Sequence, residues 1–99
     1  MTLAYIGLGA NLGDARNTLL QAAKSLAQTD GIHQLALSKL YRTAPVDSSG
    51  PDYINAAAAI HTSLSASALL AALQRIEQEH GRLRPYRNAP RTLDLDLLL

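Results

Sequence analysis

The chain has 99 residues, enough for one small domain, and 47% of them are hydrophobic, so a folded core is expected. Its formal net charge of +1 gives no sign of a nucleic-acid-binding surface, and the absence of cysteine excludes disulfides and thiolate metal sites. No apolar run reaches membrane-spanning length and no signal peptide is visible, so we expect a cytoplasmic protein with neither a membrane nor a nucleic-acid partner.

The first half of the chain predicts a strand, a helix and a second strand. Side chains of residues 2–9 alternate between two faces, which is typical of a strand. Asp14 is a suitable N-cap for a helix over residues 15–28, where apolar residues recur at helical spacing. Residues 33–43 predict the second strand, and a change of apolar phase at Leu40 indicates a bulge or a bend.

The second half repeats this order after a loop. Proline, serine and glycine are concentrated in residues 44–51, which predicts the loop, and residues 53–62 predict a third strand. Ser65 or Ser67 is expected to cap a second helix that runs to about His80.

A basic, irregular loop over residues 82–91 leads into a fourth strand over residues 92–99. The order βαββαβ predicts an α+β, ferredoxin-like fold with an antiparallel sheet and both helices on one face. Residues 1–99 are expected to be a single domain. Because an apolar strand end is a poor way to finish a domain, we expect the natural protein to continue past Leu99.

The strand phases divide this sheet into a covered face and an open face. Residues expected to pack under the helices are Ile6, Leu8, Ile54, Ala56, Ala58, Leu93, Leu95 and Leu97. Residues expected on the open face are Tyr5, Gly7, Gly9, Tyr53, Asn55, Asp94 and Asp96. The first strand lies between the third and fourth in this topology, so its glycines would leave room for a ligand on the sheet.

Asp94 and Asp96 are two residues apart on a strand, so their carboxylates are expected on one side, roughly 6–7 Å apart at the backbone. Such a pair is unfavourable without a nearby cation. Magnesium prefers one or two carboxylates together with waters and substrate phosphates. The alternative is an ordinary solvated strand face, which the pair alone favours until the preceding arginines are considered.

The residues around the aspartates suggest a phosphorylated ligand and a planar one. Guanidinium groups suit polyphosphate, although an ordinary solvated loop stays open as an alternative. Tyr53 could stack on a planar heterocycle and Asn55 could hydrogen-bond to it, or both could be an ordinary surface pair. The arginines that precede the aspartates are Arg82, Arg84, Arg87 and Arg91.

Five blocks resemble one family in the order expected for it. They are residues 4–13 (AYIGLGANLG), 41–45 (YRTAP), 52–56 (DYINA), 74–77 (QRIE, with Gly81-Arg82 following) and 87–98 (RNAPRTLDLDLL). Together they resemble the 6-hydroxymethyl-7,8-dihydropterin pyrophosphokinases of the folate pathway over essentially the whole chain.

The resemblance implies transfer of diphosphate from Mg-ATP to the hydroxymethyl group of the pterin, giving AMP, in tetrahydrofolate biosynthesis by a monomeric enzyme. It implies that Asp94 and Asp96 bind two magnesium ions and form the catalytic group together with Arg82 and Arg91. The implied pterin-binding residues are Thr43, Pro45, Val46, Tyr53 and Asn55. The implied nucleotide-binding residues are Gln74, Glu77, Arg82, Arg84 and Arg91.

The chain departs from this family at two places. Many members have an aromatic residue where Asn88 stands, and Tyr86 is nearby but offset. Members also continue well past Leu99, and the missing part normally supplies further contacts to both substrates.

Two other interpretations stay open at this point. One is a non-catalytic ferredoxin-like binding module, which magnesium-dependent ligand binding would argue against. The other is an inactive or domain-swapped fragment of a pyrophosphokinase, and a measured solution mass would detect swapping.

Overall fold

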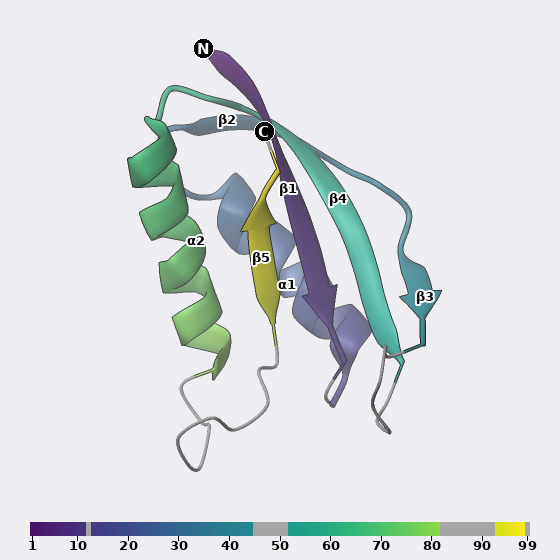
Figure 1. The fold of residues 1–99 in the computed structure, drawn as a ribbon. Coiled ribbons are helices and arrows are strands. Elements are labelled where there is room, and N and C mark those ends of the chain that lie inside the picture. The colour runs from purple at the N-terminus through teal and green to yellow at the C-terminus, as the bar shows by residue number, and fades with distance from the viewer. Residues whose placement is uncertain (12, 45–51, 82–92, 99) are drawn as a thin grey trace.

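The computed structural model describes residues 1–11, 13–44, 52–81 and 93–98, and all structural statements concern these residues. Figure 1 shows the arrangement of the elements. In chain order they are β1 (Thr2–Ala10), α1 (Ala15–Ala27), β2 (Ile32–Leu37), β3 (Tyr41–Thr43), β4 (Tyr53–Thr62), α2 (Ala66–Gly81) and β5 (Asp94–Leu97).

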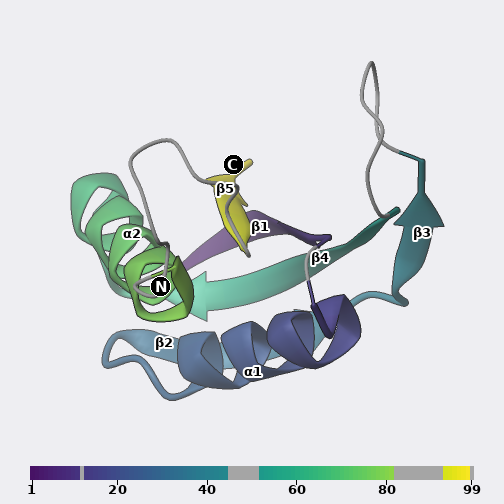
Figure 2. The same ribbon diagram turned by 90° about the horizontal axis from the view of Figure 1, so that it is seen from below.

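The strands form one antiparallel sheet in the order β2-β4-β1-β5, and β3 pairs with the first residues of β4. Helix α1 packs against β1, β2 and β4, whereas α2 packs against β5 and α1, so the helices share one face (Figure 2). The predicted α+β, ferredoxin-like fold is therefore confirmed, with β1 in the middle of the sheet between β4 and β5.

The strand predicted over residues 33–43 is two strands, β2 and β3. Leu37 pairs with Ala58, and the next described pair along the same edge of β4 joins Tyr41 to Asn55. The segment from Leu37 to Tyr41 thus advances four residues while β4 advances three, so one residue of this segment has no partner on β4. This extra residue explains the change of apolar phase at Leu40, whose side chain packs against the core.

The helix starts follow local hydrogen bonds. Asp14 is the N-cap of α1, because its carboxylate Oδ1 accepts a hydrogen bond from the backbone N of Asn17 at 3.2 Å. Of the two serines considered for α2, Ser65 is the cap. Its Oγ accepts from the backbone N of Ala68 at 3.2 Å, and Ser67 lies inside the helix.

The core lies between the sheet and the helices and contains the predicted inward-facing residues. Ile54 and Leu97 are only partly buried but pack against it. The fourth strand is shorter than the predicted 92–99, since it covers four residues and Leu93 precedes it as a buried residue. The largest fully buried side chains are Ile6, Leu19, Leu26, Ile60 and Leu73.

A compact connection joins the start of β2 to the end of β4. The hydroxyl of Thr62, only 2% exposed, donates to the carbonyl of Gly31 at 2.6 Å and accepts from the backbone N of Leu64 at 3.0 Å. Gly31 has φ +91°, and a Cβ there would lie 2.6 Å from Leu64 Cδ2. Position 31 therefore requires glycine for both backbone conformation and space.

We expect Gly31→Ala to destabilise the protein more than Gly13→Ala. Both glycines have positive φ, but an added Cβ at Gly13 would meet nothing within 4 Å. The backbone term alone should cost about 1–2 kcal/mol at either position. Displacing Leu64 should add about 1–3 kcal/mol at Gly31. The free energies of unfolding in urea give the comparison, and equal losses for the two variants would contradict it.

Candidate active site on the open face of the sheet

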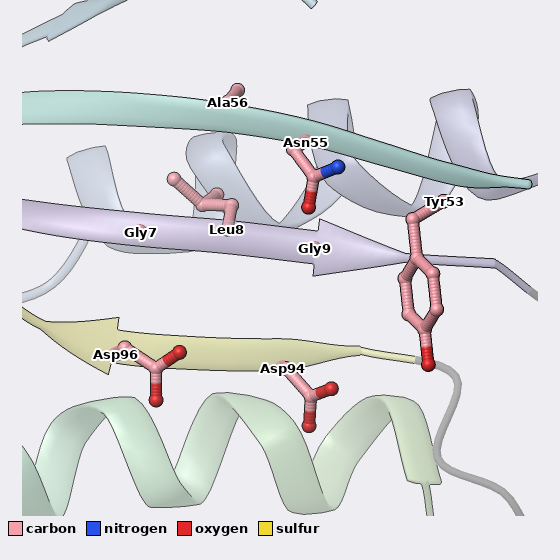
Figure 3. A pocket seen from close by; sticks show the side chains of 8 residues that line it. All are labelled: Gly7, Leu8, Gly9, Tyr53, Asn55, Ala56, Asp94 and Asp96. Carbon is pink, nitrogen blue, oxygen red and sulfur yellow. The ribbon is translucent and has the colours of Figure 1, made fainter. Parts of the chain in front are cut away.

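A hollow of about 240 Å³ lies on the open face where β1, β4 and β5 run side by side (Figure 3). Its volume is below the roughly 300–1,000 Å³ of a pocket for a drug-sized ligand, so the described residues alone would not enclose a ligand of that size. The lining residues are Gly7, Leu8, Gly9, Tyr53, Asn55, Ala56, Asp94 and Asp96.

The strand register places the polar groups of the hollow on either side of two glycines. Gly9 lies opposite Asn55 of β4 and also opposite Asp94 of β5. Two pairs further along, Gly7 lies opposite Asp96. Six of the seven residues predicted for the open face thus line the hollow. The seventh, Tyr5, is 44% exposed but does not line it.

The glycines keep the floor of the hollow at the level of the backbone. A Cβ at Gly9 would lie 3.1 Å from the Asn55 side-chain oxygen, which is tighter than ordinary van der Waals contact. A Cβ at Gly7 would lie 3.4 Å from Leu98 Cδ1, an ordinary contact distance. A side chain at position 9 would therefore disturb the Asn55 amide that lines the hollow. Leu98, which the sequence did not suggest, lies beside the floor at Gly7.

The amide of Asn55 is held in a defined orientation. Its Nδ2 donates to the hydroxyl Oγ1 of Thr43 at 2.7 Å. Thr43 is the last residue of β3 and pairs with Tyr53, so the added strand β3 brings three of the predicted pterin-binding residues together. With Nδ2 bound to Thr43, the carbonyl oxygen Oδ1 lies toward Gly9 and can accept a hydrogen bond from a ligand.

Asp94 and Asp96 both line the hollow, and their side chains project from the same side of β5 (Figure 3). Asp96 is exposed, and Asp94 is half-buried. Within the described parts of the chain, no three His, Cys, Asp or Glu side chains form a group that could hold a metal. A cation bound here would complete its shell with waters or substrate oxygens. Two carboxylates in an open hollow fit the chemistry of magnesium, which prefers such mixed oxygen ligands.

The predicted nucleotide-binding residues on α2 lie outside the lining of the hollow. Gln74 is exposed. Glu77 is partly buried, and its carboxylate Oε2 accepts a hydrogen bond from the backbone N of Leu95 at 2.9 Å. The sequence alone offered no signal for this contact, which joins residues 18 positions apart on a helix and a strand.

The remaining predicted site residues lie outside the described residues, so their roles stay predictions. They are Pro45, Val46, Arg82, Arg84 and Arg91, together with Arg87 and the departure at Asn88. As to membranes, none of the helices in the described ranges is long and apolar enough to cross one.

Comparison with known proteins identifies relatives over the whole chain. A family model described as 7,8-dihydro-6-hydroxymethylpterin-pyrophosphokinase (HPPK) matches residues 5–99. The chain is 46% identical to the 2-amino-4-hydroxy-6-hydroxymethyldihydropteridine pyrophosphokinase of Haemophilus influenzae over 100 residues, which cover 100% of the chain and 62% of that protein. It is 45% identical to the Pseudomonas putida protein of that name over 96 residues, which cover 97% of the chain and 80% of that protein.

A third relative of the same name, from Bacillus subtilis, is 43% identical over 98 residues, which cover 98% of the chain and 59% of that protein. The chain thus spans about 62% of the length of the Haemophilus protein and about 59% of the Bacillus one. The match over residues 5–99 and these identities confirm the resemblance: the chain belongs to the 7,8-dihydro-6-hydroxymethylpterin-pyrophosphokinase family.

Proposed function

We propose that the protein transfers diphosphate from ATP to the hydroxymethyl group of 6-hydroxymethyl-7,8-dihydropterin, giving AMP, as a step in tetrahydrofolate biosynthesis. The observation that carries this proposal is the hollow, in which Tyr53 and Asn55 face the two aspartates across Gly7 and Gly9. This spacing suits a substrate with a planar heterocycle at one end and a reacting alcohol at the other. Family membership supports the same reaction, and the binding-module interpretation is not favoured.

The β4 side of the hollow would hold the pterin. Asn55 Oδ1, oriented by Thr43, would accept a hydrogen bond from an N–H group of the heterocycle. The ring of Tyr53 extends from β4 across the end of β1 and offers an apolar surface to the pterin (Figure 3). The glycines allow a flat ring to approach the sheet backbone closely. Pro45 and Val46 would complete this pocket.

The β5 side would hold the phosphates. The hydroxymethyl oxygen attacks the β-phosphorus of ATP, the bond from that phosphorus to the oxygen shared with the α-phosphate breaks, AMP leaves, and the alcohol proton is released. Asp94 and Asp96 would hold magnesium, with two ions proposed, and bound magnesium would neutralise charge on the phosphates. The carboxylates would fix the position of the magnesium and, only through it, the position of the phosphates relative to the alcohol.

The other assignments complete the proposal. Arg82 and Arg91 would stabilise charge on the transferred group, with Arg84 and Gln74 on the nucleotide side. Residues 1–99 would form the core domain of a cytoplasmic enzyme that is monomeric when complete.

The direct test is product analysis with Mg-ATP and 6-hydroxymethyl-7,8-dihydropterin. Formation of AMP and the pterin diphosphate in equal amounts is expected from the protein at the length of its relatives. Absence of both products from that protein would overturn the proposal. The same assay on residues 1–99, with a mass from light scattering, decides whether this part is active, inactive or domain-swapped.

We expect Asp96→Ala to lower the rate of transfer by at least about 10²-fold, comparable to the loss of one group that stabilises developing charge. Asp96 is exposed on β5, so the free energy of unfolding should change by less than about 0.5 kcal/mol. AMP release and urea unfolding measure the two effects. Asp30→Ala, which removes an exposed carboxylate between α1 and β2, is the matched control and should keep full activity. An Asp96→Ala enzyme with most of its activity would refute the metal assignment.

We expect Thr43→Val to weaken pterin binding by about 5- to 10-fold, because the Asn55 amide loses the hydrogen bond that orients it, worth about 1 kcal/mol. Thr43→Ser keeps the hydroxyl and should bind the pterin nearly as well as the wild type. Fluorescence titration with the pterin measures the dissociation constants. If Thr43→Ser and Thr43→Val weaken pterin binding equally, the hydrogen bond from Asn55 to Thr43 does not contribute to that binding.

A further inference from the structure

The strand that carries the two aspartates is an edge strand whose outer side is capped by a helix side chain. β5 has four residues, and within the described ranges it pairs only with β1. The backbone N of Leu98 donates to the carbonyl of Tyr5, and N–H groups on an antiparallel strand alternate in direction. The N–H of Leu95 therefore points away from β1, and Glu77 Oε2 accepts it at 2.9 Å. Figure 1 shows α2 beside β5 on this side.

Buried side chains hold the backbone on both sides of this hydrogen bond. Ile76, which precedes Glu77 on α2, is 2% exposed, and the Leu95 side chain is 5% exposed. The Leu95 residue is thus held by its own side chain, by the pairing with Leu8 of β1, and by Glu77 on the remaining side. A hydrogen bond to a carboxylate is also stronger than one between neutral groups.

Leu95 stands between Asp94 and Asp96, so its position decides how the two carboxylates are spaced. Among the described residues, the outer edge of β5 has no second ladder to hold the strand that carries the two carboxylates. Glu77 supplies the missing restraint from outside the sheet, on an element that does not line the hollow.

We propose that Glu77 is a positioning residue: it holds the Leu95 peptide and thereby preorganises Asp94 and Asp96 for a shared divalent cation. This inference rests on the metal role given to the aspartates in the proposed function. This positioning role differs from the nucleotide contact that the family resemblance implies for Glu77. It requires a side chain long enough to place a hydrogen-bond acceptor at the Leu95 N–H, and it does not require a negative charge.

The test compares four proteins by NMR in the absence of nucleotide: wild type, Glu77→Ala, Glu77→Gln and Glu79→Ala. Glu79 is an exposed glutamate of the same helix and serves as the matched control. The first readout is hydrogen exchange of the Leu95 amide. The second is a titration with Mn²⁺ alone, followed by broadening of the Gly7 and Gly9 amide signals beside the aspartates.

Glu77→Ala should lose protection of the Leu95 amide and bind Mn²⁺ about 10-fold more weakly, the usual cost of removing a group that supports metal ligands. Glu77→Gln keeps an acceptor oxygen and should restore both readouts, and Glu79→Ala should match the wild type. A role of Glu77 in general stability would not distinguish the Ala and Gln variants in this way at a temperature where both are folded.

Two results would overturn the inference alone: wild-type Mn²⁺ affinity in Glu77→Ala, or equally weak binding in the Gln and Ala variants. Absence of Mn²⁺ broadening in the wild type would overturn the metal assignment itself and the inference with it. If Glu77→Ala does not fold, Glu77→Asp replaces it, because the shorter side chain keeps the charge but loses the reach. Weak Mn²⁺ binding by Glu77→Asp together with normal Mn²⁺ binding by Glu77→Gln then supports the positioning role. Normal binding by Glu77→Asp together with weak binding by Glu77→Gln overturns that role.

Discussion

The antiparallel pairing of β1 with β4 on one side and β5 on the other is the constraint on which the site depends. It places Gly9 in a row with Asn55 and Asp94, and Gly7 beside Asp96. A slip of one residue in either ladder would turn the aspartates or the amide into the core. The same register buries Ile6 and its neighbours, so the hydrophobic core enforces the geometry of the polar face.

The two halves of the hollow are supported in different ways. Asn55 and Tyr53 stand on a ten-residue strand that is paired on both edges, with β1 on one side and β3 on the other. Asp94 and Asp96 stand on four residues at the sheet edge, where Glu77 is the restraint from the helix layer. We therefore expect the β4 half of the hollow to be the more rigid one and the β5 half to depend on support from outside the sheet.

Family membership and the site geometry support the same chemistry independently. The match over residues 5–99 places the chain in the pyrophosphokinase family, and the hollow brings an aromatic side chain, an amide and two carboxylates together, as the proposed reaction requires. The hollow is smaller than a pocket for a drug-sized ligand, and the chain spans about 62% of the length of its Haemophilus relative. The proposed enzyme would need the arginine segment 82–91 and further contacts to enclose the nucleotide.

The sequence by itself determined the element order, the two faces of the sheet and the residues of the open face, because side chains alternate with a strict period of two along a strand. It also determined the family, through residues 87–98 and four other blocks in the expected order. Only the tertiary structure decided that residues 33–43 form two strands, that Thr43 orients Asn55, and that Glu77 holds Leu95. These features depend on contacts between residues distant in the chain, and no local pattern encodes which distant partner a side chain will meet.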